Sequence, residues 1–224
     1  MANKNLVIIP LRANSKRLLN KNILDLGGIP LFMHSVNYAR ENIKKGDKII
    51  IVTNDDLVKK IAKRNHVEVI DRPEEISGEF EPTITALQYV LSRFNKDFEN
   101  VILLQATNPL RPKNLFKEAL EVFNKQECKS LMTVSKSEKK LGKINNSVFK
   151  PYSYIFGQRS QDLEPLYFEN GLIYISKAEL IIGGKIIDTK CYPFIVDHIF
   201  STIDIDIKED LELANYYFNK MMHE

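Results

Sequence analysis

Residues 6–10 read LVIIP, and residues 48–53 read KIIIVT. Both runs are apolar without alternation, which is typical of strands buried on both faces of a parallel sheet. Between them, residues 30–42 place apolar side chains at helical spacing, and Pro30 suits the first turn of a helix. This stretch predicts a strand, a helix and a second strand parallel to the first.

The same alternation continues along the chain. Helical patterns occupy residues 57–64, 83–94 and a segment with Leu115, Ala119, Leu120 and Phe123 on one face, and strand patterns occupy 67–70, 101–105, 170–175 and 192–196. Residues 208–222 predict a closing helix with Leu211, Ala214, Phe218 and Met221 facing inward. The order predicts an α/β fold, a Rossmann-like and mostly parallel sheet sandwiched by helices. Ligands of such sheets bind beyond the carboxyl ends of the strands.

The length and composition fit one globular domain. The chain has 224 residues, 44% of them hydrophobic, and a net charge of only +3, which does not indicate a nucleic-acid partner. Cys128 and Cys191 lie too far apart in sequence for a zinc motif or a disulfide framework. No apolar run reaches the ~18 residues of a membrane span, and the first run is too short for a signal peptide, so we expect a cytoplasmic protein without a membrane partner.

Residues 11–22 hold four basic side chains and no acidic one, directly after the first predicted strand. Arg12, Lys16 and Lys21 have the chemistry to surround a polyphosphate, and Asn14 and Ser15 add hydrogen-bond donors. The alternative is a solvated basic loop. The chain contains neither GxGxxG nor GxxxxGK[ST] at this position, which disfavours a dinucleotide dehydrogenase or a P-loop ATPase.

Five segments carry a family resemblance. In chain order they are Arg12-x-Asn14-Ser15-Lys16-x-Leu18-x-x-Lys21-Asn22, Arg72-Pro73-Glu74-Glu75, Leu104-Gln105-Ala106-Thr107-Asn108-Pro109-Leu110-Arg111, Glu169-Asn170-Gly171-Leu172-Ile173-Tyr174-Ile175 and Ser201-Thr202-Ile203-Asp204-Ile205-Asp206. Together they resemble the signature segments of the acylneuraminate cytidylyltransferases, the CMP-sialic acid synthetases. The chain departs from that family at Ala106, where a proline is common, and at Asn108, where a serine is common.

The resemblance implies a nucleotidyltransferase type A fold and a reaction that joins CTP to a nine-carbon 2-keto sugar acid, releasing pyrophosphate. It implies that Arg12, Lys16 and Lys21 contact the triphosphate and act in catalysis, that Asn22 and Arg72 read the cytosine ring, and that Thr83 helps to hold the nucleotide. Nucleotidyl transfer depends mainly on positioning and charge neutralisation.

Asp204 and Asp206 are two residues apart, so in an extended chain both carboxylates project to the same side. Ile203, Ile205 and Ile207 then form the buried face. Two carboxylates plus phosphate oxygens suit Mg²⁺ (or Mn²⁺), and with the resemblance we expect both residues to be catalytic metal ligands. The alternative is an acidic cap for the helix that follows.

Four residues are candidates for contact with the sugar. Gln105 ends a predicted strand and matches a family residue that contacts the sugar, and Asn108 follows it. Arg111 binds substrate or only tethers its loop. Arg159 resembles an arginine that receives the sugar carboxylate, the alternative being a surface salt bridge. No histidine lies in a recognisable catalytic pattern.

Residues 136–168 are polar, rich in lysine and interspersed with aromatic residues, which predicts an arm that protrudes from the domain 1–224. The family resemblance implies that this arm forms a homodimer; a mobile flap is the alternative. Two other functions stay open. One is a non-catalytic nucleotide-sugar sensor. The other is a CMP-Kdo synthetase, whose loop is similar at Arg12, Ser15, Arg17, Leu18 and Lys21. Sialic, legionaminic and pseudaminic acids all remain candidate substrates.

Overall fold

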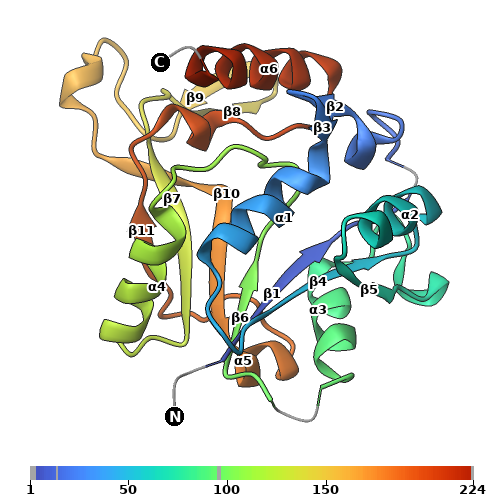
Figure 1. Ribbon diagram of the computed structural model, residues 1–224. Coiled ribbons are helices and arrows are strands. Elements are labelled where there is room, and N and C mark those ends of the chain that lie inside the picture. Colours follow the sequence, from blue (N-terminus) through green and yellow to red (C-terminus); the bar gives the residue numbers. More distant parts are fainter. Residues whose placement is uncertain (1–3, 14, 95–96, 223–224) are drawn as a thin grey trace.

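A seven-stranded sheet forms the centre of the molecule (Figure 1). The computed structural model describes residues 4–13, 15–94 and 97–222. The sheet runs in the order β11-β7-β10-β6-β1-β4-β5. Its strands are β1 (Asn5–Pro10), β4 (Lys48–Thr53), β5 (Glu68–Asp71), β6 (Asn100–Leu103), β7 (Ser130–Ser137), β10 (Leu166–Lys177) and β11 (Tyr192–Ile195).

The sheet is mostly parallel, as predicted. β1 lies between β4 and β6 and pairs with both in parallel, so that Ile8 lies opposite Ile50 and Leu103. β10 runs antiparallel to β6 and β7, and β11 is parallel to β7. Six strands therefore share one direction, and β10 opposes them.

Helices cover both faces of the sheet. The helices are α1 (Leu31–Asn42), α2 (Asp56–Arg64), α3 (Thr83–Leu91), α4 (Leu115–Lys125), α5 (Ala178–Ile182) and α6 (Lys208–Met222). Val7 and Ile9 of β1 pack in one core cluster with α1, α2 and α4, whereas Leu6 and Ile8 pack in a second cluster with α3 and α5. Burial on both faces explains why this strand is apolar from Leu6 to Ile9.

β7 is a strand that the sequence analysis did not predict. Its buried face includes Thr133 and Ser135, whose hydroxyls bond the backbone of Ile173 and the carbonyl of Val196. Buried polar residues with internal partners interrupt the hydrophobic pattern from which strands are predicted. β10 is also longer than the predicted segment 170–175, and α3 ends at Leu91 rather than at residue 94.

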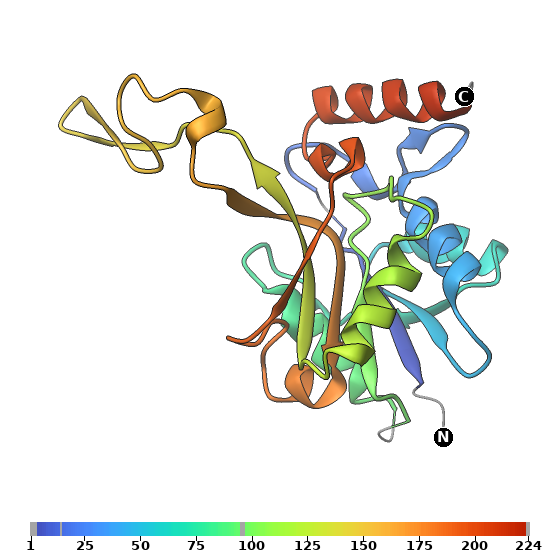
Figure 2. The ribbon, with the colours of Figure 1, turned by 90° about the vertical axis from the view of Figure 1, so that its left-hand side faces the viewer.

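The predicted arm projects from the end of β7 and returns into β10 (Figure 2). It holds the hairpin of β8 (Gly142–Asn145) and β9 (Val148–Pro151) and a short 3-10 helix, η3 (Ser160–Asp162). Several of its large apolar side chains are exposed, among them Ile144, Tyr152, Ile155 and Phe156. Its role in dimer formation stays a prediction.

The segment before α6 differs from the prediction. Residues 203–207 form no strand, and although Ile203 and Ile205 are buried, Ile207 is 41% exposed. The alternation ends because the chain turns into α6, where Asp210 accepts the backbone N–H groups of Asp206 and Ile207. Asp210 thus provides the acidic helix cap that was the alternative role for Asp204 and Asp206.

A third core cluster holds α6 against the carboxyl end of the sheet. It contains Ile203, Ile205 and Ala214. Leu26, within the small hairpin of β2 (Asp25–Leu26) and β3 (Ile29–Pro30), and Leu31, directly after this hairpin, belong to the same cluster. Leu211 and Phe218 pack against this cluster as predicted, but Met221 is half exposed.

Two further expectations concern the chain as a whole. Cys128 and Cys191 are free and half-buried, as expected for a chain without a disulfide framework. Within the described residues, no helix combines the length and the apolar character needed to span a bilayer.

We predict that Ile205→Ala lowers the free energy of unfolding by about 2–5 kcal/mol, because Ile205 is fully buried and its removal leaves a cavity. Ile207→Ala is the matched control and lowers it by less than about 1 kcal/mol. Urea unfolding followed by circular dichroism measures both, and equal losses for the two variants would contradict the placement of this segment.

Candidate functional site

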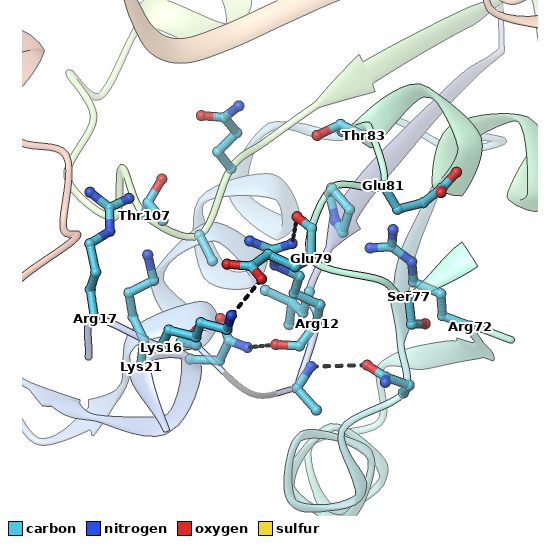
Figure 3. Close-up of a pocket in the computed structure, with 18 of the residues that line it drawn as sticks. Arg12, Lys16, Arg17, Lys21, Arg72, Ser77, Glu79, Glu81, Thr83 and Thr107 are labelled. Atoms are coloured by element: carbon cyan, nitrogen blue, oxygen red, sulfur yellow. Dashed lines mark hydrogen bonds and ion pairs between the residues drawn. The ribbon is translucent and has the colours of Figure 1, made fainter. Parts of the chain in front are cut away.

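A cavity of about 800 Å³ opens at the carboxyl ends of β1, β4, β5 and β6 (Figure 3). Its walls are the loops that follow these strands, together with the segment before α6. Nine predicted site residues line it: Arg12, Ser15, Lys16, Lys21, Asn22, Arg72, Thr83, Gln105 and Asp206. Asn14 lies outside the described residues. The fold therefore assembles side chains that are up to 194 positions apart in sequence, from Arg12 to Asp206, at the edge where parallel sheets bind ligands.

The cations of the 11–22 loop have acidic partners elsewhere in the fold. Lys16 forms an ion pair with Glu79 at 2.5 Å, and Arg12 donates to the carbonyl oxygens of Gly78 and Glu79. Figure 3 shows Lys16 directed at Glu79 across the cavity. Residues 11–22 contain no acidic side chain, and their positive charge is thus partly neutralised by Glu79, which lies more than 60 positions away in sequence.

Lys21 and Arg17 share a second acidic partner, Asp206. Their side-chain nitrogens lie 2.9 and 2.7 Å from its carboxylate oxygens. Lys21 is only 13% exposed in its side chain, whereas Arg17 is 68% exposed. Although partial desolvation opposes ionisation, hydrogen bonds and charge from Lys21 and Arg17 lower the pKa of Asp206. Neighbouring Asn22 is buried and ties the loop together by donating to the carbonyl of Arg12.

Arg72 lines the cavity and has a buried donor without a hydrogen-bond partner among the described residues. Its side chain is buried, and its Nε donates to the carbonyl oxygen of Ile76 at 2.7 Å. Its Nη2 is the single buried side-chain nitrogen or oxygen without a hydrogen-bond partner in the described part of the chain. Burial, together with the positive charge of Arg12, lowers the pKa of Arg72. An unsatisfied buried donor is costly, so this N–H has the chemistry to bind an acceptor on a ligand.

A second cavity of about 390 Å³ adjoins the first, since Gln105 lines both. Its walls include Glu169, Tyr174 and Asp204, and no lysine or arginine is among the described residues around it. The Tyr174 hydroxyl donates to Glu169 at 2.6 Å, and burial together with this bond raises the pKa of Tyr174. Neither Glu169 nor Tyr174 was predicted as a site residue, although the motif from residue 169 to 175 contains both.

The two carboxylates of the 203–207 segment lie at the junction, with Asp206 on the first cavity and Asp204 on the second. Desolvation and, after it, the negative charge of Asp206 raise the pKa of Asp204, against a hydrogen bond from Thr107. No group of three His, Cys, Asp or Glu side chains within residues 4–13, 15–94 and 97–222 is arranged to hold a metal ion. Mg²⁺ at nucleotide sites is commonly held by one or two carboxylates plus substrate phosphates, and this pair offers those hard oxygen ligands.

Three predicted sugar ligands line neither cavity. Arg111 is buried, and it donates to the carbonyls of Leu172 and Gln105 and to the Ser35 hydroxyl at 2.7–3.0 Å, so its contacts fit the tethering alternative. Burial lowers its pKa to about 10. Asn108 is also buried, and its side-chain amide donates to the backbone carbonyls of Asn170 and Ile203. Arg159 pairs with Asp162 within the arm and is 70% exposed.

Comparison with known proteins gives three findings. A family model for cytidylyltransferases matches residues 6–219. The chain is 33% identical, over 92% of its length and 51% of the relative's, to an N-acylneuraminate cytidylyltransferase of Streptococcus agalactiae serotype III (strain NEM316). It is 30% identical, over 99% of its length and 98% of the relative's, to a pseudaminic acid cytidylyltransferase of Campylobacter jejuni subsp. jejuni serotype O:23/36 (strain 81-176).

Among solved structures, a CMP:2-keto-3-deoxy-manno-octonic acid synthetase complexed with CTP superposes with a TM-score of 0.73. The alignment covers 98% of this chain and all of the other, at 16% sequence identity, and so shows a shared fold. The chain spans about half the length of the streptococcal relative.

We predict that Glu79→Gln strengthens binding of a nucleoside triphosphate, because Lys16 is released from its ion pair. Lys16 and Glu79 are both exposed, and exposed pairs contribute about 0.2–1 kcal/mol, so the affinity rises by up to about fivefold. Isothermal titration with CTP measures the change. Glu75→Gln is the control, since Glu75 is exposed and does not line the cavity. An equal rise in that variant would mean that overall charge, and not the pair, is responsible.

Proposed function

The chain belongs to the cytidylyltransferase family, and on this premise we propose that it joins CTP to a nonulosonic, sialic-type 2-keto sugar acid, giving a CMP-sugar and pyrophosphate. The observation that carries the proposal is the pair of adjoining cavities. The first is lined by several basic side chains and the second by none among the described residues. Gln105 lines both, Asp206 lines the first and Asp204 lines the second.

The larger cavity suits the nucleotide. Arg12, Lys16 and Lys21 supply positive charge for a triphosphate, and displacement of Glu79 and Asp206 from these cations accompanies binding. On the far wall, the free Nη2 of Arg72 offers a donor to a base carbonyl such as that of cytosine. Because the donor is buried, a base that cannot accept from it leaves it unsatisfied, which favours one base over another.

The smaller cavity suits the sugar. Glu169, Tyr174 and Asp204 accept or donate hydrogen bonds to hydroxyl and amide groups. From this cavity the anomeric hydroxyl reaches the α-phosphorus past Gln105. A new oxygen–phosphorus bond forms, the bond to pyrophosphate breaks, and the hydroxyl proton is released. The developing negative charge lies beside Lys21, whose side chain is mostly shielded from solvent and therefore acts strongly on it.

Asp204 and Asp206 are proposed to hold Mg²⁺ or Mn²⁺ together with phosphate oxygens. When bound, such an ion neutralises phosphate charge and polarises the α-phosphate. The residues fit this use, because Asp204 and Asp206 supply carboxylate oxygens, and no lysine or arginine is among the described residues that line the smaller cavity with Asp204.

A homodimer formed through the arm is part of the proposal. The arm exposes Ile144, Ile155 and Phe156, more than 60% each, and such apolar side chains are normally covered by a partner. It also carries Arg159 and several lysines, which are the charges that the smaller cavity lacks for binding a sugar acid. Arg159 is therefore proposed to meet the sugar carboxylate of the partner subunit.

The sugar itself is the open choice, because relatives of 33% and 30% identity are named for two different sugars. We expect pyrophosphate release when the protein is mixed with CTP, Mg²⁺ and one of N-acetylneuraminate, legionaminate, pseudaminate or Kdo, followed by a coupled phosphate assay. Release with Kdo alone would identify the CMP-Kdo synthetase alternative. Binding of CTP without release for any of the four would favour a non-catalytic sensor and contradict the proposal.

We predict that Asp206→Ala lowers turnover by at least about 100-fold, since a metal ligand is lost. Metal-free CTP binding is retained or strengthened, because Lys21 and Arg17 lose their internal partner. Pyrophosphate release and CTP titration in EDTA measure the two effects. Glu209→Gln, an exposed change of one charge in the first turn of α6, serves as the control. Unchanged turnover in Asp206→Ala would refute the metal role.

A further inference from the structure

Asn108 holds together the two walls between which the sugar and the metal are proposed to meet. We infer that Asn108 is a positioning residue for the Asp204 carboxylate, and not a ligand of the sugar. This inference rests on the proposed function, because it concerns the metal-binding role of Asp204.

The contacts of Asn108 join two segments that are distant in sequence. Its side chain is 1% exposed, and its Nδ2 donates to the carbonyl oxygens of Ile203 at 3.0 Å and of Asn170 at 3.2 Å. A primary amide has two N–H donors on one nitrogen, so one side chain satisfies both carbonyls. Ile203 directly precedes Asp204, and Asn170 lies beside Glu169 on the wall of the smaller cavity.

Thr107, which directly precedes Asn108 in sequence, bonds the backbone on the C-terminal side of Asp204. The backbone N–H of Ile205 donates to the Thr107 carbonyl at 2.8 Å, so both peptide neighbours of Asp204 are bonded to residues 107 and 108. The Thr107 hydroxyl also donates to the side-chain Oδ1 of Asn108 at 3.3 Å. Because residues 203–207 belong to no strand, these bonds replace a sheet ladder in fixing the carboxylate.

The opposite wall is packed against the same amide. The pairing of β10 with β7 is interrupted between Glu169 and Tyr174, and Gly171 adopts a φ of +74° within this bulge. A Cβ on Gly171 would lie 2.7 Å from the Asn108 Oδ1 and 3.1 Å from the Gln105 Oε1. The backbone of the cavity wall thus approaches Asn108 so closely that only glycine fits there, and a shift of Asn108 moves that wall as well.

The chemistry of the amide explains why this position is sensitive. A serine in this place has a single O–H donor and bonds one of the two carbonyls, and an alanine bonds neither. Loss of the bond to Ile203 leaves a buried carbonyl unsatisfied next to Asp204. The substitutions Asn108→Ser and Asn108→Ala therefore form a graded series that loosens Asp204 without removing its carboxylate.

Mn²⁺ binding to the protein–CTP complex without sugar, followed by electron paramagnetic resonance, tests the inference. For Asn108→Ala we expect Mn²⁺ affinity to fall about 10- to 100-fold, as for other residues that orient a metal ligand, with a smaller loss for Asn108→Ser. CTP affinity in EDTA stays within about twofold of the wild type. Asn215→Ala, which removes an amide that bonds only within α6, is the control and leaves Mn²⁺ affinity unchanged.

Three results would overturn the inference. The first is unchanged Mn²⁺ affinity in Asn108→Ala, or in Asn108→Ser if the alanine variant does not fold by circular dichroism. The second is a raised KM for the sugar with unchanged Mn²⁺ binding, which marks Asn108 as a sugar ligand. The third is a wild type whose CTP complex binds no Mn²⁺. Pyrophosphate release by the wild type tests the proposed function separately, so the two failures are distinguishable.

Discussion

The site depends on the burial of β1 on both of its faces. Val7 and Ile9 pack into one core cluster and Leu6 and Ile8 into the other, so this strand cannot shift without exposing apolar surface on one side. Its carboxyl end is thereby fixed, and the basic loop that follows starts from a rigid point. The loops after β4, β5 and β6 start from the same edge because these strands are parallel to β1. A cavity at this edge is a consequence of the strand directions.

Charge balance across the cavity is the second constraint. Basic side chains around one cavity repel one another. The carboxylates of Glu79 and Asp206 reduce this repulsion by forming ion pairs with Lys16 and Lys21. These acids hold the cations in place before a ligand arrives, which reduces the conformational entropy lost on binding. They also compete with an anionic ligand, so the same contacts that organise the site limit its affinity. Asp206 serves both purposes in the proposed reaction, as a partner of Lys21 and as a metal ligand.

The periodic elements of the fold were predictable because their residues repeat a pattern over a whole element. The bounds of β4 and α6 agree with the prediction. β4 contains the unbroken apolar run 49–52, and Asp210 in the first turn of α6 accepts two backbone N–H groups at the start of the helix. β7 was missed because Thr133 and Ser135 are buried and bonded internally. Ile207 was expected to be buried, but the turn into α6 ends the alternation at Asp206. Both errors occur where a side-chain hydrogen bond overrides the local hydrophobic pattern.

For the site, the sequence by itself determined the order of the elements, the basic loop after the first strand and the paired aspartates, because each depends on neighbouring residues. Only the tertiary structure decided which of these side chains face a ligand. It gave the basic loop its acidic partners, gave Arg111 and Asn108 hydrogen bonds within the protein, and placed Glu169 and Tyr174 on a cavity. The physical reason is that a polar side chain has the same donors and acceptors wherever it lies. Whether it binds substrate or backbone depends on which groups from distant segments the fold brings within about 3 Å of it.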